Sequence, residues 1–520
     1  MEFDLIIRNG NVVDGSGAAR IRADVGVKNG RIAAVGDLSA ASAAETIDAS
    51  GRIVAPGFID VHIHSEVNLL DPSNPLRYGA LLQGVTTHLA GPDGFGWARL
   101  DPQLAQELYQ AEIFAYGEVP LDFIWPTAND YLALFPGKSP ANVMPQIPHC
   151  AIRLEVMGWD DRPATDEEIE RMKIGVLDWL EAGASCLCLG LDYAPSASSD
   201  TRELIELSKL VAEHGGIYAT HQRYNDLGAE RAWLETIEIG RKAGIPVHVS
   251  HAGVDEMTAR IMRELDDEID LTFESYLYPA GCTDLTLMLP IWASAGGPKA
   301  ILERISQPDL RAKMVAHLQT RLVENKGTAR IVFADNPGKR FIGEEIGDVA
   351  ERLGIKPGEF AMRMIEEESP YCVMIYMRGW DDERTDAMIR DTVQHPLMMV
   401  ASDGIYHGAS SHPRGAGCFA RVFRVAVREM GAISLEEAVR KMTSFPAERF
   451  RIGDRGYLRP GYGADIVIFD EETIADRSTW TEPFLEPVGI DRVIVNGRTV
   501  ILDGAPTGET PGQIVKRANC

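Results

Sequence analysis

The chain has 520 residues, of which 45% are hydrophobic and 25% are charged, as in a globular protein that buries a large core. Lysine and arginine total 51 against 77 acidic residues, so the formal net charge is −26. A surface this acidic repels nucleic acids and anionic membranes, and we expect neither as a partner.

The amino terminus and the cysteines bear on the cellular compartment. The chain begins MEFDLIIRNG, without the basic start and apolar run of a signal peptide. Apolar stretches such as 397–401 are too short to span a bilayer. The seven cysteines are odd in number and lack the spacing of a disulfide framework. We therefore expect a cytoplasmic protein.

The first 50 residues predict short strands separated by turns. Asn-Gly and Asp-Gly pairs divide alternating apolar residues there, which is a hairpin signature. The same pattern of alternating apolar residues and turns occurs near the carboxyl end, in GYGADIVIFD and DRVIVNGRTVILDG. Neither half makes a convincing sheet alone. We predict one small β-sandwich domain built from both termini, residues 1–55 and 455–520.

Between these segments, short apolar runs alternate with amphipathic helical stretches, the pattern of βα units. Eight candidate strands fall at 57–64, 84–91, 150–158, 186–193, 216–222, 246–253, 269–278 and 396–404. We therefore predict an α/β fold with a TIM-like (β/α)8 barrel over residues 56–454.

A long interruption separates the last two candidate strands. It is rich in helix formers, as in AILERISQPDLRAKMVAHLQTRLVEN. Insertions that follow barrel strands lie over the active face. We assign residues 283–345 to a helical insertion that acts as a lid or specificity subdomain.

Histidines and acids fall where the candidate strands end. His62 and His64 alternate on the first strand and face the same side, while His221, His251 and Asp403 end strands five, six and eight. Carboxyl ends of barrel strands carry catalytic groups, and imidazole and carboxylate are ligands of catalytic zinc. One histidine alone is more often a hydrogen-bonded core residue. Five such side chains converging on one rim favour a metal site.

These motifs are also similar to a known family. PGFIDVHIH, His221, SHAG and SDG resemble the amidohydrolase superfamily. GVTTHLAGPDG, GLDYAPS, SYLYPAGCT, SDGIYHGASSHPR and SFPAERFRIGDRGYLRPGYGADIVIFD look like its N-acyl-D-amino-acid deacylase (D-aminoacylase) branch. The resemblance covers essentially the whole chain. It implies zinc as the cofactor, with one or two divalent ions: His62, His64 and Asp403 hold one site, and His221 and His251 the other.

Two departures from the family pattern concern the metals. Many members bridge two metals with a carboxylated lysine on strand four, but 186–193 contains no lysine. The deacylase branch places a cysteine after strand two, where this chain has Pro92-Asp93-Gly94. A carboxylate can bridge two metals, so we predict Asp93 as a ligand in place of the thiolate. The alternative is a turn with no metal role.

The resemblance also implies the chemistry. A metal-activated hydroxide attacks the carbonyl of a linear amide, Asp403 takes the proton and then passes it to the leaving nitrogen. The expected substrate is a small-molecule amide, an N-acyl-D-amino acid or a similar N-acyl compound that carries a carboxylate.

Four residues match substrate-binding positions of the branch. Arg414 would hold the carboxylate, for which its forked guanidinium is suited, unless it forms only a surface ion pair. The other three are Tyr193, Tyr276 and Cys282, which stands where the family usually has serine. Gly253 stands where members that act on acidic substrates carry a lysine, which disfavours N-acyl-D-glutamate or aspartate.

Two alternatives stay open at this point. The first is an amidohydrolase of another bond, a carbamate, urea, anilide or cyclic amide, although the missing strand-four lysine argues against the last. The second is a non-catalytic barrel that serves as a scaffold. The sequence does not decide between a monomer and a homo-oligomer.

Overall fold

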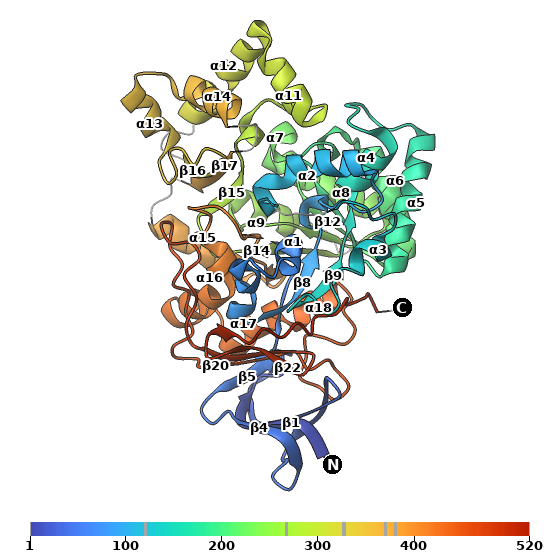
Figure 1. The fold of residues 1–520 in the computed structure, drawn as a ribbon, viewed down its shortest axis with the longest axis vertical. Helices are drawn as coiled ribbons and strands as arrows, with labels where there is room; N and C mark the ends of the chain where they lie inside the picture. The colour runs from blue at the N-terminus through green and yellow to red at the C-terminus, as the bar shows by residue number, and fades with distance from the viewer. Residues whose placement is uncertain are drawn as a thin grey trace.

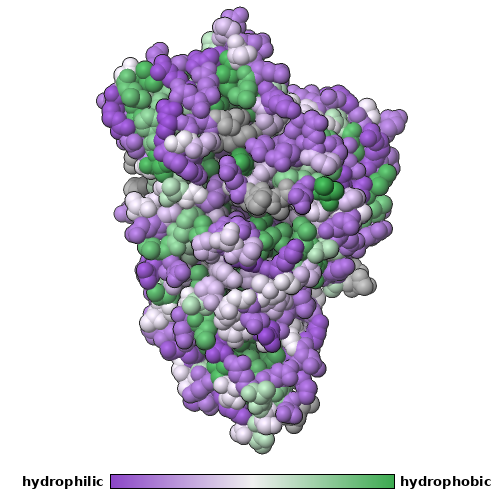
Figure 2. Space-filling model, in the orientation of Figure 1, coloured by the Kyte–Doolittle hydropathy of each residue, from purple (hydrophilic) through white to green (hydrophobic). Residues whose placement is uncertain are grey.

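A computed structural model describes residues 2–118, 122–265, 269–324, 329–368, 372–378 and 382–518. Figure 1 shows a β-domain with the amino terminus at one end of the molecule, a barrel in the middle and an inserted subdomain at the opposite end. The face in Figure 2 is mainly hydrophilic, and its apolar side chains lie in small scattered groups. In the ranges described, none of the helices has the length and apolar character needed to cross a membrane.

Strands from both termini form one nine-stranded sheet, in the order β23-β22-β21-β20-β5-β1-β2-β3 with β4 beside β1. The two ends of the chain meet where β5 pairs antiparallel with β20. The sheet encloses its own apolar core, which includes Leu5, Val25 and Ile466. This confirms that both termini build one β-domain. Its strands are β1 (Glu2–Val12), β2 (Ile21–Lys28), β3 (Arg31–Gly36), β4 (Ser42–Asp48), β5 (Ile53–Pro56), β20 (Ile466–Phe469), β21 (Ile490–Val495), β22 (Arg498–Leu502) and β23 (Ala505–Pro506).

Two of the predicted Asn-Gly turns are hairpins of this sheet. Asn29-Gly30 joins β2 to β3, and Asn496-Gly497 joins β21 to β22. All four residues have positive φ, between 48° and 78°. Asparagine and glycine adopt this left-handed region most readily, which is why such pairs fit two-residue hairpins.

The barrel closes through parallel strand pairs. Its strand positions in chain order are β6 and β7 (Phe58–Asp60, Ile63–His64), β8 (Val85–Ala90), β9 and β10 (Asn142–Pro145, Ile147–Pro148), β11 (Cys186–Gly190), β12 (Ile217–His221), β13 (Val247–Val249), β14 (Leu271–Ser275), and β18 and β19 (Met398–Val400, Gly404–Ile405). β6, β8 and β9 pair in order, β10 to β18 continue the series, and β19 pairs with β7. The eight positions therefore form a ring, as the sequence predicts.

Helices surround this ring (Figure 1). They are α1 (Glu66–Leu70), α2 (Pro102–Tyr116), α3 (Ala128–Leu132), α4 (His149–Met157), α5 (Asp166–Ala182), α6 (Thr201–Glu213), α7 (Tyr224–Leu227), α8 (Ala229–Ala243), α9 (Glu256–Glu264), α15 (Asp382–Gln394), α16 (Arg414–Arg421), α17 (Leu435–Met442) and α18 (Ser444–Arg449), with 3-10 turns η1 (Pro75–Tyr78), η2 (Leu81–Gln83), η3 (Pro92–Gly94) and η4 (Ser196–Ser198) and the π-helical η6 (Val422–Glu429).

The third strand is not where the sequence analysis places it. Residues 150–157 of the predicted strand 150–158 lie in helix α4, and the strand lies just before it, in β9 and β10. The run CAIRLEVMG is buried along most of its length, and a short buried apolar run does not distinguish a helix from a strand. The true strand contains Pro145 and Pro148, which argue against a strand in sequence.

The insertion between β14 and β18 has a second apolar core, which runs from Leu285 to Met374. It contains the predicted helices, and also an antiparallel sheet, β15-β17-β16, that the sequence analysis does not predict. The domain limits given above, including 283–345 for the insertion, stay predictions. Its elements are β15 (Ala280–Asp284), η5 (Leu285–Met288), α10 (Ile291–Ser294), α11 (Gly297–Ile305), α12 (Pro308–Glu324), β16 (Ala329–Asp335), α13 (Ile346–Leu353), α14 (Pro357–Glu367) and β17 (Val373–Arg378).

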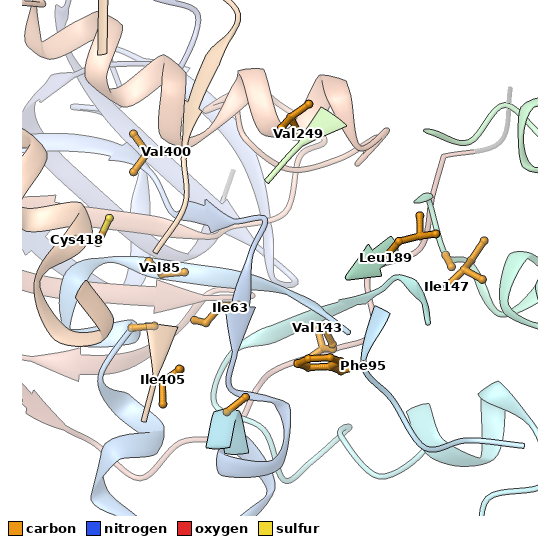
Figure 3. Close-up of a cluster of buried hydrophobic side chains, with 14 of the residues drawn as sticks. Ile63, Val85, Phe95, Val143, Ile147, Leu189, Val249, Val400, Ile405 and Cys418 are labelled. Carbon is orange, nitrogen blue, oxygen red and sulfur yellow. The ribbon is translucent and has the colours of Figure 1, made fainter. Parts of the chain in front are cut away.

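Alternate residues of the barrel strands belong to two different hydrophobic cores. Leu187 and Leu189 of β11 belong to the large cluster between strands and helices, which Figure 3 shows around Ile63, Val85 and Val400. Cys186 and Cys188 belong to a smaller cluster with residues of β6, β8, β9, β12 and β18. Successive strand residues face opposite sides, so the smaller cluster fills the barrel. This packed interior holds the strand ends in place beneath the site.

Candidate metal centre and its pocket

The candidate metal ligands surround one pocket at the carboxyl ends of the barrel strands. His64 lies in β7, His221 ends β12, and His251 follows β13. Asp93 lies in η3 after β8, and Asp403 lies between β18 and β19. These five residues line the pocket, which has a volume of about 390 Å³. His62 does not line it but lies against Asp93 and Asp403. The structure thus brings together all the residues that the sequence analysis selects as ligands.

Three of the candidate ligands have unusual backbone conformations. Asp93, His251 and Asp403 have φ of +56°, +38° and +48°. The left-handed region is strained for residues other than glycine, and such strain is concentrated at functional sites. The fold therefore holds these side chains in orientations that a relaxed loop does not provide.

The ligand atoms form two adjoining groups. His62 Nε2 lies 3.5 Å from Asp93 Oδ2 and 3.6 Å from Asp403 Oδ1, and His64 Nε2 lies 3.7 Å and 3.4 Å from the same two atoms. Ligand atoms of His62, His64 and Asp403 lie within 4.8 Å of one another, as do those of His62, Asp93 and His251. His221 Nδ1 lies 3.0 Å from His251 Nε2. Asp93 therefore lies between the two groups, where a bridging carboxylate is expected.

The electrostatics of the centre suit a cation. Burial opposes the ionisation of His62, yet the carboxylates of Asp93 and Asp403 raise its pKa well above the usual value. Burial and the charge of His221 lower the pKa of His251 to about 4, so this imidazole is neutral at physiological pH, as a ligand must be. Within the described chain, His62 Nε2 and Asp93 Oδ1 are buried without a hydrogen-bond partner. The donors present therefore fit a divalent metal such as zinc.

Two buried carboxylates that sequence reasoning missed hold the histidines from behind. Glu274 Oε1 lies 3.0 Å from His62 Nδ1 and accepts a hydrogen bond from the His251 amide, while its Oε2 contacts His248. Asp192 Oδ2 lies 3.1 Å from His221 Nε2. A carboxylate on the second nitrogen fixes the tautomer and direction of a ligating histidine. An acid inside the apolar run of strand seven is the sequence signal for Glu274.

We predict that Glu274→Gln lowers the zinc affinity of the protein by about 10- to 100-fold. The amide keeps the size of the side chain but removes the charge that orients His62. Burial opposes the ionisation of Glu274, but His248 and His62 lower its pKa, so the native group is a carboxylate. Competition with a chelator measures the affinity directly.

The matched control is Glu235→Gln. Glu235 is also a carboxylate of the barrel, but it binds Arg223 and Thr201 rather than a candidate ligand. It should leave zinc affinity unchanged. If Glu274→Gln binds zinc as tightly as this control, Glu274 does not orient the centre.

Arg414 lies beside the candidate centre and is not a surface residue. It is 1% exposed, and its Nη1 lies 2.9 Å from Asp403 Oδ2. Its guanidinium carbon lies 4.6 Å from the ring centre of Tyr276, and its Nη2 donates to the Cys282 carbonyl oxygen at 3.4 Å. Nε is buried without a hydrogen-bond partner within the described chain. A buried guanidinium with an unsatisfied donor beside an open pocket is suited to bind an anion.

The other predicted substrate residues line the same pocket. The Tyr193 hydroxyl pairs with the Thr283 hydroxyl at 2.9 Å, and its ring packs against His221. Burial raises the pKa of the Cys282 thiol to about 11, so the thiol is neutral. Opposite, Gly253 faces Met388, and Trp233 and Met257 complete a mainly apolar wall.

The ring of parallel strands and the acid–histidine cluster at its carboxyl ends define a class of α/β barrels built to bind a divalent metal. The amidohydrolase family model matches residues 45–501. The chain belongs to the amidohydrolase family.

The relatives cover the whole chain. An N-acyl-D-glutamate deacylase of Alcaligenes xylosoxydans xylosoxydans is 33% identical over 99% of this chain and 97% of its own length. A D-aminoacylase of the same organism is 32% identical over 99% and 98%. A crystal structure of N-acyl-D-glutamate deacylase from Bordetella bronchiseptica, complexed with zinc and a phosphonate inhibitor, superposes with a TM-score of 0.80 at 33% identity and covers 99% of this chain and 100% of that one.

Proposed function

We propose that the protein is a zinc-dependent hydrolase of N-acyl-D-amino acids. The observation that carries this proposal is the placement of Arg414 against Asp403, at the edge of the centre formed by His62, His64, Asp93, His221 and His251. Relatives named as deacylases of N-acyl-D-amino acids, one of them crystallised with zinc, support it.

His62, His64 and Asp403 would hold one metal site, and His221 and His251 the other, with Asp93 between them. When bound, zinc supplies a Lewis acid that activates water and polarises the carbonyl of the amide. These side chains offer ligands for one or two ions.

Asp403 moves the proton. It takes a proton from the attacking water and gives it to the nitrogen of the leaving amine, which could not otherwise depart as a neutral molecule. Burial opposes the ionisation of Asp403, but Arg414 and His62 hold its pKa far below the usual value. The group is therefore an ionised carboxylate at neutral pH and has a free site for a proton. Glu274 and Asp192 keep the histidines in place from behind.

Arg414 would bind the carboxylate of the substrate, with the Tyr193 and Tyr276 hydroxyls beside it. The Cys282 carbonyl oxygen orients the guanidinium, so this residue acts through its backbone. The wall around Gly253, Trp233 and Met257 offers an apolar surface to the amino-acid side chain. We therefore favour a neutral, apolar D-amino acid over glutamate or aspartate.

The same pocket argues against the alternatives. Cyclic-amide hydrolases with a bridging lysine require that lysine in the pocket. None of the lysines in the described part of the chain lines it. Carbamates, ureas and anilides that carry no carboxylate would leave Arg414 without a partner in the substrate. A non-catalytic scaffold has no need for buried ligand atoms kept without hydrogen bonds.

The test combines elemental analysis with an activity panel on one purified sample. We expect stoichiometric zinc and release of free D-amino acid from N-acetyl-D-methionine or N-acetyl-D-leucine, with little release from the L-compounds or from N-acetyl-D-glutamate. Zinc without any D-selective release would overturn the deacylase assignment and leave carbamates, ureas and anilides to be assayed.

The proposal extends to compartment and partners. In the described part of the chain the six cysteines are buried and form no disulfide, which agrees with a reducing cytoplasm. The net charge of −26 argues against a nucleic-acid partner.

A further inference from the structure

A second cavity adjoins the metal pocket, and the proposed hydrolysis does not use it. Both cavities share the side chains of Phe114, Tyr193 and Leu287 as walls. The rest of the second cavity, called here the side pocket, is lined by Phe95, Ala111, Trp159, Ile291 and Ile301 among others. Its walls are therefore mainly apolar and include several residues of the insertion.

The strand order places the side pocket across the barrel from Arg414. Phe95 and Ala111 follow strand two, Trp159 follows strand three and Tyr193 follows strand four. Arg414 follows strand eight, which lies opposite strand four in the ring and is separated from strand two by strand one. An N-acyl amino acid that places its carboxylate at Arg414 and its amide at the centre must direct its acyl group away from Arg414. The acyl group then lies on the side of the barrel where strands two to four end.

Two carboxyl groups line the side pocket without giving it negative charge. Burial raises the pKa of Asp284 to about 8 and that of Glu112 well above its usual value. Both groups are therefore mainly neutral at pH 7. Asp192, the third acid of the wall, accepts from the Asn225 amide and contacts His221. An apolar group can enter this pocket without facing an uncompensated charge.

The size of the side pocket restricts what fits. Its volume is about 60 Å³, compared with about 390 Å³ for the metal pocket. A cavity of roughly 150 Å³ accommodates benzene, so an aromatic ring needs more room than the side pocket provides. At the same scale of roughly 25 Å³ per carbon, the side pocket holds about two to three carbon atoms of an alkyl chain.

We propose that the side pocket binds the alkyl part of the substrate's acyl group and selects a short unbranched chain, with about two to three carbons beyond the carbonyl. This inference rests on the proposed function, because it assigns one part of the same substrate. Specificity for the acyl chain then comes from α2 and the insertion, and specificity for the amino acid comes from strands five to eight.

The test is a series of one D-amino acid acylated with acetyl, butyryl, hexanoyl or phenylacetyl groups. Each buried methylene raises kcat/KM by at most about fourfold, so we expect about a tenfold gain from acetyl to butyryl. Hexanoyl and phenylacetyl should both fall below butyryl. Ala111→Leu fills the pocket and should lower the ratio of butyryl to acetyl activity by about tenfold. Ile291→Ala widens it and should favour hexanoyl and phenylacetyl.

Gln110→Leu is the matched control, because it adds the same side chain to an exposed position of the same helix. It should keep the wild-type profile. Equal activity on every acyl length, or an Ala111→Leu effect that follows the amino-acid side chain instead, would overturn the acyl assignment while N-acetyl hydrolysis leaves the proposed function intact. Failure to hydrolyse any compound of the series would contradict both.

Discussion

Asp403→Asn should lower kcat by about 10²- to 10⁴-fold while the protein keeps its zinc. The amide has nearly the same shape and retains an oxygen that can face the metal, but it cannot accept the proton of the attacking water. Asp403 Oδ1 lies within 3.6 Å of both His62 Nε2 and His64 Nε2, and Oδ2 lies beside Arg414, so the carboxylate adjoins both the candidate metal site and the candidate substrate site. Single-turnover rates and elemental analysis on the same sample check this expectation.

Asp255→Asn is the control for this substitution. Asp255 lines the same pocket, but its side chain caps α9 by accepting from the Thr258 amide and contacts none of the candidate ligands. Asparagine keeps that cap, so zinc content and kcat should remain close to wild type. An Asp403→Asn enzyme that is zinc-loaded and as active as this control would show that another group carries the proton.

The residues that could be predicted from the sequence are those fixed by local pattern. His221, His251 and Asp403 each lie at the end of a run that reads as a strand, and parallel strands bring their carboxyl ends to one rim. Alternation alone puts His62 and His64 on one side. These ligands follow from strand boundaries without knowledge of the packing between strands.

Interactions between distant segments could not be predicted in the same way. Glu274 reaches His62 across 212 positions of the chain, and only the closure of the barrel brings them together. The insertion sheet likewise pairs two segments that are far apart in the chain, Ala280–Asp284 and Val373–Arg378. The burial of Arg414 could not be predicted from the sequence, because an arginine that follows a strand ordinarily forms a surface ion pair. Each of these depends on a tertiary contact that leaves no periodic signal.

Arg414→Met should reduce kcat/KM for N-acyl-D-amino acids by about 10²- to 10³-fold, since removing one member of a buried charge pair costs about 2–5 kcal/mol. Arg414 contacts Asp403 as well as the open pocket, so activity on one substrate does not separate recognition of the carboxylate from support of the base. A second substrate in which a carboxamide replaces the carboxylate does separate them. If Arg414 binds the carboxylate, the wild-type preference for the acid over the carboxamide should collapse toward one in the variant.

Arg421→Met provides a closely matched control for that comparison. Arg421 also lies over a tyrosine, 4.4 Å from the Tyr278 ring centre, and pairs with Asp476, but it does not line the pocket. Its removal should leave the preference for the acid as in wild type. A loss of Arg414 that slows both substrates equally would assign this residue to positioning Asp403, and carboxylate recognition would then have to lie with Tyr193 and Tyr276. Arg414→Lys refines the result, because a lysine keeps the charge but not the two parallel donors and should restore only part of the preference.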